Sequence, residues 1–307
     1  MTGVICLSLQ TMQPAPVPTS CVLCLGNFDG VHIAHRALMH TAAKLRAHRF
    51  PDAVCGVFCF DPPTSAFLQE SPAYLCTREE KLERFRDAGM EYAFLADFPT
   101  LRSYSPEQFV LDVLKKECHC VAAVCGFNHR FGHRGAGDPA LLQALLGGPV
   151  EVQSEISENE KAVSSSRIRN LLWAGSVEEA TKLLSQPYTL TAEVIHGKAL
   201  GRKWGFPTVN QAFPKNALVP KHGVYVTDCT LADGSHYRGV SNVGKRPTVD
   251  SDDTVNCETH LIDFDGDLYG KTMTVAFLHY LRPEMKFQTT EALRAQIEAD
   301  KRAAKEY

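Results

Sequence analysis

The sequence of 307 residues lacks the features of a membrane or exported protein. It has no run of 18 consecutive apolar residues, so we expect no transmembrane helix. No lysine or arginine precedes Arg36, whereas a signal peptide needs a positively charged start. These absences predict a cytoplasmic protein without a membrane partner.

The chain also lacks an excess of positive charge. Its 32 Lys and Arg residues are outnumbered by 35 Asp and Glu residues, which gives a formal net charge of −3. Nucleic acids attract basic surfaces, so the composition predicts no nucleic-acid partner. The length is enough for one large domain or two of medium size, because cores usually split beyond about 250 residues.

Cysteine is plentiful, but its placement argues against a disulfide framework or a zinc site. The eleven cysteines are an odd number, and most lie in apolar runs such as residues 21–25 and 54–60. There a thiol behaves as a small apolar side chain. The motif Cys118-His119-Cys120 has no second ligand pair at zinc spacing. We therefore predict free thiols that fill a core in a reducing compartment.

Short apolar segments alternate with amphipathic segments between residues 21 and 150. Residues 54–60 and 121–125 predict buried strands, whereas residues 78–86 and 106–114 predict helices, the second capped by Ser105. This alternation is typical of a doubly wound α/β domain with a parallel sheet. Such domains bind ligands at the carboxyl ends of their strands.

The pattern changes after about residue 187, where strands follow one another without helices between them. The predicted strands are residues 189–195, 223–231, 237–243, 258–263 and 272–278. Asp233-Gly234 is a hairpin-turn dipeptide, and residues 290–304 predict a final helix. We therefore predict two domains, an α/β domain at residues 1–186 and an antiparallel β-barrel with a C-terminal helix at 187–307.

The most informative segment is residues 26–35, which carry the pattern G-x-F-D-G-V-H-x-x-H. It follows the apolar run 21–25 and leads into a helical pattern, so His32 and His35 lie where a helix begins. The free N–H groups and the dipole of a helix N-terminus attract phosphate, and imidazoles can add hydrogen-bond donors. The simpler interpretation is a glycine-containing turn of the kind that any parallel α/β protein has.

Two further segments of the first half carry polar groups. Residues 126–132 follow the predicted strand 121–125, again at a carboxyl end. Residues 163–169 place serines and two arginines at the start of a helix, where acidic residues are usual. The serines and arginines predict a second phosphate clamp. The alternative is an ordinary helix cap with solvated arginines.

Together these segments resemble the bacterial bifunctional riboflavin kinase/FAD synthetase family, whose first domain is similar to the HxGH-type nucleotidyltransferases. The resemblance covers nearly the whole chain, with the motifs in the family's order. In the second half it rests on Gly197 with Gly201-Arg202, and on residues 205–210, 220–225, 242–248, 258–264 and 268–270.

The resemblance implies that the first domain transfers the adenylyl group of ATP to FMN, giving FAD and pyrophosphate. His32 and His35 would contact the ATP phosphates, and Asn128 would help to hold the nucleotide and the metal. Ser164, Ser165 and Arg169 would clamp the leaving phosphates. The turn itself would contribute Gly26, Asn27, Phe28 and Asp29.

For the second domain the resemblance implies ATP-dependent phosphorylation of riboflavin to FMN. Thr208 and Asn210 would hold Mg²⁺ and phosphates, and both offer the oxygen atoms that a hard cation accepts. Glu258 would deprotonate the riboflavin 5′-hydroxyl, as phosphoryl transfer to an alcohol requires. Gly197, Gly201 and Arg202 would cover the phosphates, and Arg282 would lie on the flavin side. Taken singly, Pro-Thr is also an edge-strand turn and Glu258 an exposed strand residue.

The chain departs from the family pattern mainly in its first half. Ala34 stands between the histidines where glycine is usual, and Pro63 replaces a histidine of the F-x-P-H-P segment. Alanine suits a helix, but it would be penalised if the turn needed a positive φ at that position. Two alternatives stay open: a monofunctional riboflavin kinase with a degenerate nucleotide-binding first domain, or a non-catalytic flavin carrier. The sequence also leaves open whether the chain forms a homo-oligomer.

Overall fold

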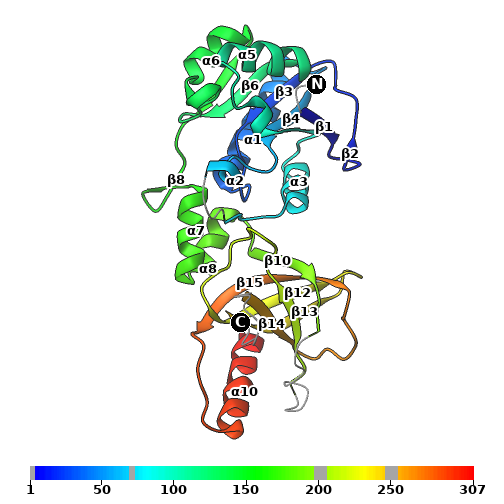
Figure 1. Cartoon of the computed structure of the whole chain (residues 1–307), viewed down its shortest axis with the longest axis vertical. Helices are drawn as coiled ribbons and strands as arrows, with labels where there is room; N and C mark the ends of the chain where they lie inside the picture. Colours follow the sequence, from blue (N-terminus) through cyan, green and yellow to red (C-terminus); the bar gives the residue numbers. More distant parts are fainter. Residues whose placement is uncertain (1–3, 69–72, 197–205, 246–254) are drawn as a thin grey trace. The chain divides into compact units, whose positions relative to one another are not determined.

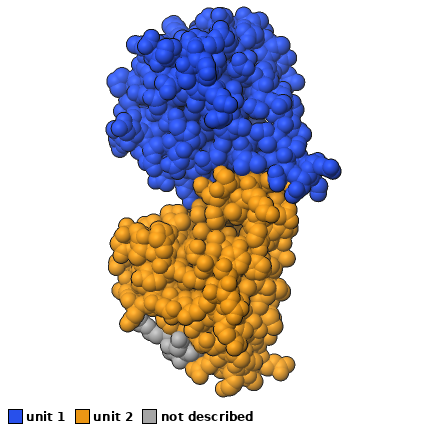
Figure 2. Space-filling view, turned by 180° about the vertical axis from the view of Figure 1, so that it is seen from behind, with its two compact units in different colours: residues 1–72, 76–165 blue, residues 73–75, 166–307 orange. Residues whose placement is uncertain are grey.

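The computed structural model describes residues 4–68, 73–196, 206–245 and 255–307. By their contacts these fall into two compact units (Figure 2). Unit 1 comprises residues 1–72 and 76–165, and unit 2 comprises residues 73–75 and 166–307. Residues 73–75 belong to unit 2 because Tyr74 N–H donates to the Asn216 carbonyl at 2.7 Å. This division by contacts does not test the boundary between functional domains predicted at residues 186 and 187, which stays a prediction.

Unit 1 is built on a seven-stranded sheet with the order β2-β1-β5-β4-β3-β6-β7 (Figure 1). The strands are β1 (Val4–Ser8), β2 (Gln13–Pro14), β3 (Cys21–Leu25), β4 (Val54–Phe60), β5 (Tyr92–Ala96), β6 (Cys120–Gly126) and β7 (Val150–Gln153). Strands β3 to β7 pair in parallel, which confirms the predicted doubly wound sheet. The antiparallel edge of β1 and β2 was not predicted, because the proline-rich stretch hides it; proline is tolerated on an edge strand.

Helices cover both faces of this sheet. They are α1 (Ile33–Arg49), α2 (Ser65–Leu68), α3 (Arg78–Asp87), α4 (Phe98–Leu101), α5 (Pro106–Gln108), which continues into the π-helical η1 (Phe109–Glu117), the 3₁₀ turn η2 (His133–Gly135) and α6 (Pro139–Leu146). Thr77 and Ser105 begin α3 and α5 with capping boxes, so the predicted cap at Ser105 is confirmed. In the described ranges no helix has the length and apolarity needed to cross a bilayer.

The core of unit 1 has two halves, one on each face of the sheet. Alternate residues of β3 point to opposite faces, so Val22 and Cys24 join one cluster while Leu23 and Leu25 join the other. The first cluster includes side chains of α1 and α3, and the second includes side chains of η1 and α6. All eleven cysteines are free thiols and ten are buried, as the sequence predicted.

The order of the parallel strands fixes where a ligand can bind. Strand β3 lies between β4 and β6, so the chain winds outward in one direction through β4 and β5 and in the other through β6 and β7. A crevice opens at the carboxyl ends of the strands where the winding direction changes. Residues 26–35 and 126–132 both begin at this point, because they follow β3 and β6.

Unit 2 contains a six-stranded antiparallel sheet with the order β10-β15-β12-β13-β14-β11. The strands are β10 (Tyr188–Glu193), β11 (Val209–Ala212), β12 (Gly223–Leu231), β13 (His236–Lys245), β14 (Val255–Leu261) and β15 (Thr272–Arg282). A bridge from Ile195 N–H to the Asn210 carbonyl, 2.8 Å long, joins the two edges and nearly closes the barrel. The predicted barrel is confirmed, and β11 is a strand that the sequence analysis missed.

In its described residues unit 2 also contains the helices α8 (Val177–Leu184) and α10 (Thr290–Glu306), the second of which is the predicted final helix. It contains α7 (Ser165–Ala174) as well, except for Ser165, which belongs to unit 1. A buried ion pair attaches α10 to the barrel. Arg282 Nη2 lies 2.7 Å from Asp300 Oδ2, Arg282 Nε donates to the same carboxylate, and Gln296 adds a further hydrogen bond at 2.9 Å. Asp300 is only 5% exposed, so its carboxylate depends on these donors.

Removing that carboxylate should destabilise unit 2. We expect Asp300→Ala to lower the free energy of unfolding by about 2–4 kcal/mol, because it leaves the partly buried Arg282 guanidinium without its carboxylate. Glu298→Ala is the matched control on the same helix, since its pair with Lys301 is exposed and should contribute less than about 1 kcal/mol. Differential scanning calorimetry of the full chain would measure both, and equal effects of the two substitutions would contradict the expectation.

Candidate active sites

A strained turn connects β3 to α1. Phe28 has φ 52°, Gly30 has φ 80° and Val31 has φ 44°, so three residues of the turn are left-handed. For a β-branched residue such as Val31 this conformation is costly, about 1–3 kcal/mol. Packing holds the turn in place: the Phe28 side chain is fully buried, and its ring meets the rings of Phe85 and His35 edge-on at 5.5 and 5.2 Å.

The two predicted histidines lie together where α1 begins. His32 is the N-cap residue, and its Nδ1 accepts a hydrogen bond from His35 N–H at 3.4 Å. The two rings stack with centroids 3.6 Å apart and an interplanar angle of 14°. Because Nδ1 of His32 is an acceptor, the neutral ring carries its proton on Nε2. His32 therefore offers a ligand an N–H donor beside the free backbone N–H groups of the helix.

Both imidazoles are uncharged near pH 7. Burial lowers the pKa of His32 to about 4. The pKa of His35 is also held well below its usual range, first by burial and then by the neighbouring His32 and Lys81. Protonation of His32 at Nδ1 would also remove the acceptor that caps α1. The pair thus supplies neutral hydrogen-bond donors, and fixed charge at the site must come from other groups.

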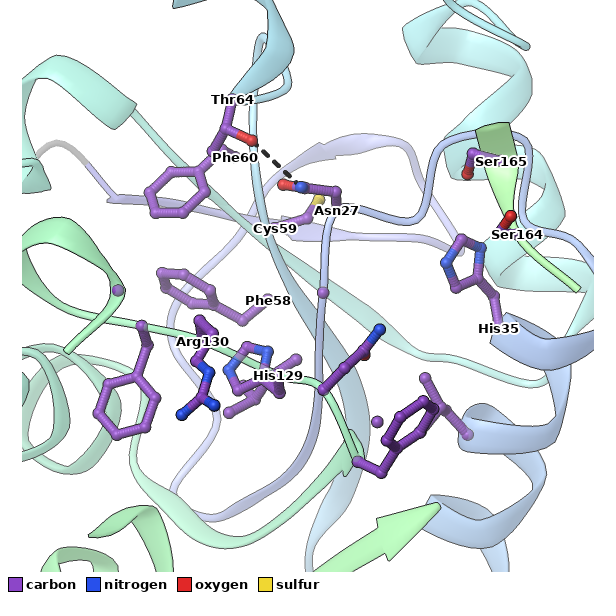
Figure 3. A pocket seen from close by; sticks show the side chains of 18 of the residues that line it. Asn27, His35, Phe58, Cys59, Phe60, Thr64, His129, Arg130, Ser164 and Ser165 are labelled. Carbon is purple, nitrogen blue, oxygen red and sulfur yellow. Dashed lines mark hydrogen bonds between the residues drawn. The ribbon is translucent and has the colours of Figure 1, made fainter. Parts of the chain in front are cut away.

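Two hydroxyl-bearing segments meet the same turn. Asn27 Nδ2 donates to Thr64 Oγ1 at 3.1 Å, which brings in the segment after β4 (Figure 3). Ser165 Oγ donates to the Asp29 carbonyl at 3.0 Å, and Ser164, Ser165 and His35 line the same cavity (Figure 3). The start of α7 is therefore tied to the histidine turn, as a shared phosphate site requires.

These groups line a cavity of about 850 Å³ in unit 1. The predicted residues that line it are Gly26, Asn27, His32, His35, Asn128, Ser164 and Ser165. Phe28 and Asp29 are buried behind the lining and support the turn. Arg169 does not line the cavity; it belongs to unit 2, where its Nε donates to the Ala73 carbonyl at 2.7 Å.

The other end of the cavity is aromatic, which the sequence analysis did not foresee. Phe58 and Phe60 come from the end of β4, Phe98 from α4, and Phe109 and Phe131 from more distant segments. Their rings meet mostly edge-on at centroid distances between 5.2 and 6.0 Å. His129 also lines this end, and its ring stacks on that of Phe131 with centroids 5.8 Å apart. The sequence pattern that could have indicated this aromatic end is Phe-Cys-Phe at residues 58–60, where β4 ends.

The two departures from the family motif have local explanations. Ala34 lies inside α1 and is not among the residues with positive φ, so glycine is not required there. Pro63 accepts a hydrogen bond from Ala66 N–H at the start of α2, and the adjacent Thr64 contacts Asn27. This segment keeps a polar contact to the turn although it lacks the histidine.

In unit 2 the predicted threonine, asparagine and glutamate come together. Asn210 on β11 lies directly opposite Glu258 on β14, so their side chains share a face of the sheet. Thr208 Oγ1 donates to Glu258 Oε1 at 2.6 Å. Asn242 on β13 is the residue opposite Glu258 on the other side, and it was not singled out from the sequence. A carboxylate is thus flanked by two amides and a hydroxyl.

The remaining predicted residues of unit 2 are less informative. Gly197, Gly201 and Arg202 lie outside the described residues. Arg282, predicted on the flavin side, forms the ion pair with Asp300 described above.

The predicted Mg²⁺ site of unit 2 would rely on the side-chain oxygens of Thr208 and Asn210. In the described part of the chain, no group of three or more His, Cys, Asp or Glu side chains is placed to hold a metal. The Thr208 hydroxyl donates its hydrogen bond to Glu258, so its oxygen lone pairs stay available to a cation, and the Asn210 side chain has an amide oxygen. This donor set fits Mg²⁺, which takes few protein oxygens and completes its shell with phosphate and water.

In a comparison with known proteins, each half of the chain matches the model of a protein family. A family model for FAD synthetase matches residues 15–167, and one for riboflavin kinase matches residues 184–307. Proteins described as bifunctional riboflavin kinase/FMN adenylyltransferase are 33% identical in Listeria monocytogenes, over 91% of this chain and 90% of the relative, and 35% identical in Pseudomonas fluorescens, over 94% of both. The chain belongs to the bifunctional riboflavin kinase/FMN adenylyltransferase family.

The presence of both domains favours the bifunctional enzyme over the two alternatives, a monofunctional kinase and a flavin carrier. A relative from Escherichia coli strain K12 is 32% identical over 97% of this chain and 96% of its own length. A crystal structure of a protein from Streptococcus pneumoniae, described as a macrolide-efflux protein, is 28% identical with a TM-score of 0.86 and covers 98% of this chain and 97% of its own. The two chains therefore share their fold over nearly their whole length.

Proposed function

We propose that the cavity of unit 1 is the site at which ATP adenylylates FMN, and that the Thr208–Glu258 site of unit 2 phosphorylates riboflavin. The observation that supports the first assignment most directly is the pair of neutral, stacked histidines at a helix N-terminus, at the switch point of a parallel sheet. FMN, the product of the second reaction, is a substrate of the first. One chain would thus carry two consecutive steps.

Adenylyl transfer needs alignment and charge stabilisation rather than a base. An FMN phosphate oxygen is already ionised; it forms a bond to the α-phosphorus of ATP while the bond to the β-phosphate oxygen breaks and pyrophosphate leaves. His32 Nε2–H, His35 and the N–H groups of the first turn of α1 would stabilise the charge on the transferred phosphorus. Ser164 and Ser165 would hold the leaving phosphates, and Asn128 would hold the nucleotide.

The aromatic end of the cavity would take the flavin ring. Phe58, Phe60 and Phe131 offer the flat apolar surfaces on which an isoalloxazine stacks, and the polar end lies beside the histidines. A cavity of about 850 Å³ is in the range that holds a ligand of this size. The FMN phosphate would then project toward the histidine pair.

Riboflavin phosphorylation does need a base, because its nucleophile is an alcohol. Glu258 would take the proton of the 5′-hydroxyl as that oxygen attacks the γ-phosphorus of ATP and ADP leaves. Thr208 and Asn210 would hold Mg²⁺, which when bound neutralises phosphate charge. Gly197, Gly201 and Arg202 would cover the phosphates, and Arg282 would support the flavin side from its pair with Asp300. A cytoplasmic location and the absence of nucleic-acid and membrane partners stay predictions from the sequence.

The base role of Glu258 can be separated from the first activity. We expect Glu258→Gln to lower the rate of FMN formation about 10²–10⁴-fold, the usual loss for a general base, while FMN is still converted to FAD. Chromatographic separation of FMN and FAD after incubation with ATP and Mg²⁺ measures both activities. Glu193→Gln, an exposed carboxylate on β10, is the matched control. Near-normal riboflavin phosphorylation in Glu258→Gln would remove the residue from this role.

The hydroxyl of Thr208 should determine the metal requirement of the kinase step. We expect Thr208→Ala to raise the Mg²⁺ concentration needed for half-maximal riboflavin phosphorylation, because an oxygen ligand is lost. ADP binding to unit 2, measured by calorimetry, should weaken as well. Thr208→Ser keeps the hydroxyl and should behave as the unmodified chain. An unchanged Mg²⁺ titration in Thr208→Ala would count against a metal role for the hydroxyl.

Unit 1 should be active despite Ala34 and Pro63. We expect FAD to form from FMN and ATP, and His32→Ala or His35→Ala to lower that rate about 10²–10³-fold, the loss typical of one donor to the transition state. Riboflavin phosphorylation should be unaffected in both variants, which controls for misfolding. A chain that makes FMN but no detectable FAD, while its unit 1 still binds nucleotide, would favour the degenerate first domain.

A further inference from the structure

One histidine beside the kinase site is not used by the reaction proposed above. His260 lies two residues after Glu258 on β14, so the two side chains share a face of the sheet. Its Nδ1 lies 2.8 Å from the Pro207 carbonyl oxygen, and Thr208 Oγ1 donates to Glu258. Two neighbouring side chains on one face of β14 therefore hold two consecutive residues of the segment that precedes β11.

The sheet itself does not hold this segment. The pairing of β11 with β14 begins at Val209, opposite Thr259. Pro207 and Thr208 precede Val209 and therefore lie outside this pairing. Proline has no N–H, which leaves the carbonyl as the only backbone hydrogen-bonding group of Pro207. The His260 ring holds that carbonyl, and because a carbonyl can only accept, His260 Nδ1 carries the proton.

The residue before Pro207 is anchored by packing. Phe206 is buried, and its ring meets that of His260 edge-on with centroids 6.0 Å apart. Lys301 of α10 places its Nζ 5.2 Å from the centroid of the same ring, a cation–π contact. His260 thus contacts both residues that precede the predicted metal ligand Thr208, one through a hydrogen bond and the other through its ring.

We propose that His260 is a positioning residue for riboflavin phosphorylation: by holding the Pro207 carbonyl through Nδ1, it fixes the segment that presents the Thr208 hydroxyl to Mg²⁺ and to Glu258. The inference rests on the function proposed for unit 2. Mg²⁺ demands near-ideal octahedral geometry, so a ligand on a loosely held segment would bind it poorly. Partners that orient metal ligands are typically worth about 10–100-fold in metal affinity or activity.

The decisive comparison is between two amides that replace the ring. The amide nitrogen of asparagine takes the place of histidine Nδ1, whereas that of glutamine takes the place of Nε2. We expect His260→Gln and His260→Ala to raise the Mg²⁺ concentration needed for half-maximal riboflavin phosphorylation about 10-fold, because the Pro207 carbonyl loses its donor. His260→Asn keeps a donor at that place and should stay close to the unmodified chain.

Two further measurements separate positioning from a general loss of stability. ADP binding in the presence of Mg²⁺, measured by calorimetry, should weaken in His260→Gln but not in His260→Asn, although both substitutions remove the ring. In a chain that already carries Thr208→Ala, His260→Gln should add little to the Mg²⁺ requirement. The two residues act on the same ligand, and the effects of residues coupled in this way are not additive.

The matched control is His236→Ala in the same sheet. His236 is an exposed histidine on β13 whose Nδ1 also makes a hydrogen bond, 3.0 Å from Thr230 Oγ1, at the hairpin between β12 and β13. Its removal should leave both activities unchanged. FAD synthesis from FMN should also be unchanged in every His260 variant, which controls for damage to unit 1.

Equal Mg²⁺ requirements in His260→Asn and His260→Gln would overturn the proposal, and so would an unchanged requirement in His260→Ala. If His260→Ala unfolds unit 2, the comparison of the two amides still decides. Glu258→Gln reports separately on the proposed function. If Glu258→Gln loses riboflavin phosphorylation and His260→Gln keeps the original Mg²⁺ requirement, only the role of His260 is wrong. If neither variant is impaired, the assignment of the kinase site itself is wrong.

Discussion

The structure of the first site depends on one constraint, the strained turn that places two histidines at the N-terminus of α1. Phe28 and Val31 adopt left-handed conformations that would relax in an isolated loop. Contacts from α3 prevent this: Phe85 packs against Phe28, and Arg84 holds the Gly30 carbonyl. The geometry at the cavity surface is therefore determined by a helix that does not line the cavity.

The two sites differ because their nucleophiles differ. A phosphate nucleophile arrives ionised, so its site needs no base, and the turn offers it the neutral imidazoles of His32 and His35. An alcohol must lose a proton, so the second site is built around Glu258, which the Thr208 hydroxyl orients. Hydrogen bonding also fixes the chemistry at both places: His32 accepts at Nδ1 and is left with Nε2–H, whereas Thr208 donates and is left with lone pairs.

Residues that act within one short segment could be predicted from the sequence, and residues assembled from distant segments could not. The histidine turn, the hairpin at Asp233 and the Ser105 cap are local patterns, and each was found. The aromatic end of the cavity was missed because its rings come from four separated segments. The burial of Lys81 could not be predicted for a related reason: in an amphipathic helix a lysine predicts a solvent-facing position, and only the tertiary packing shows that it is buried.

Two departures from good folding chemistry lie together at the histidine turn of unit 1. The left-handed Val31 and the unpartnered Nδ1 of His35 each lower stability, and a simple substitution could remove either of them. Val31 immediately precedes His32 in the chain, and both histidines line the cavity. Natural proteins break such local rules mainly at functional sites and compensate for the cost elsewhere in the fold. Here the compensation comes from α3, whose Phe85 and Arg84 hold the turn in place.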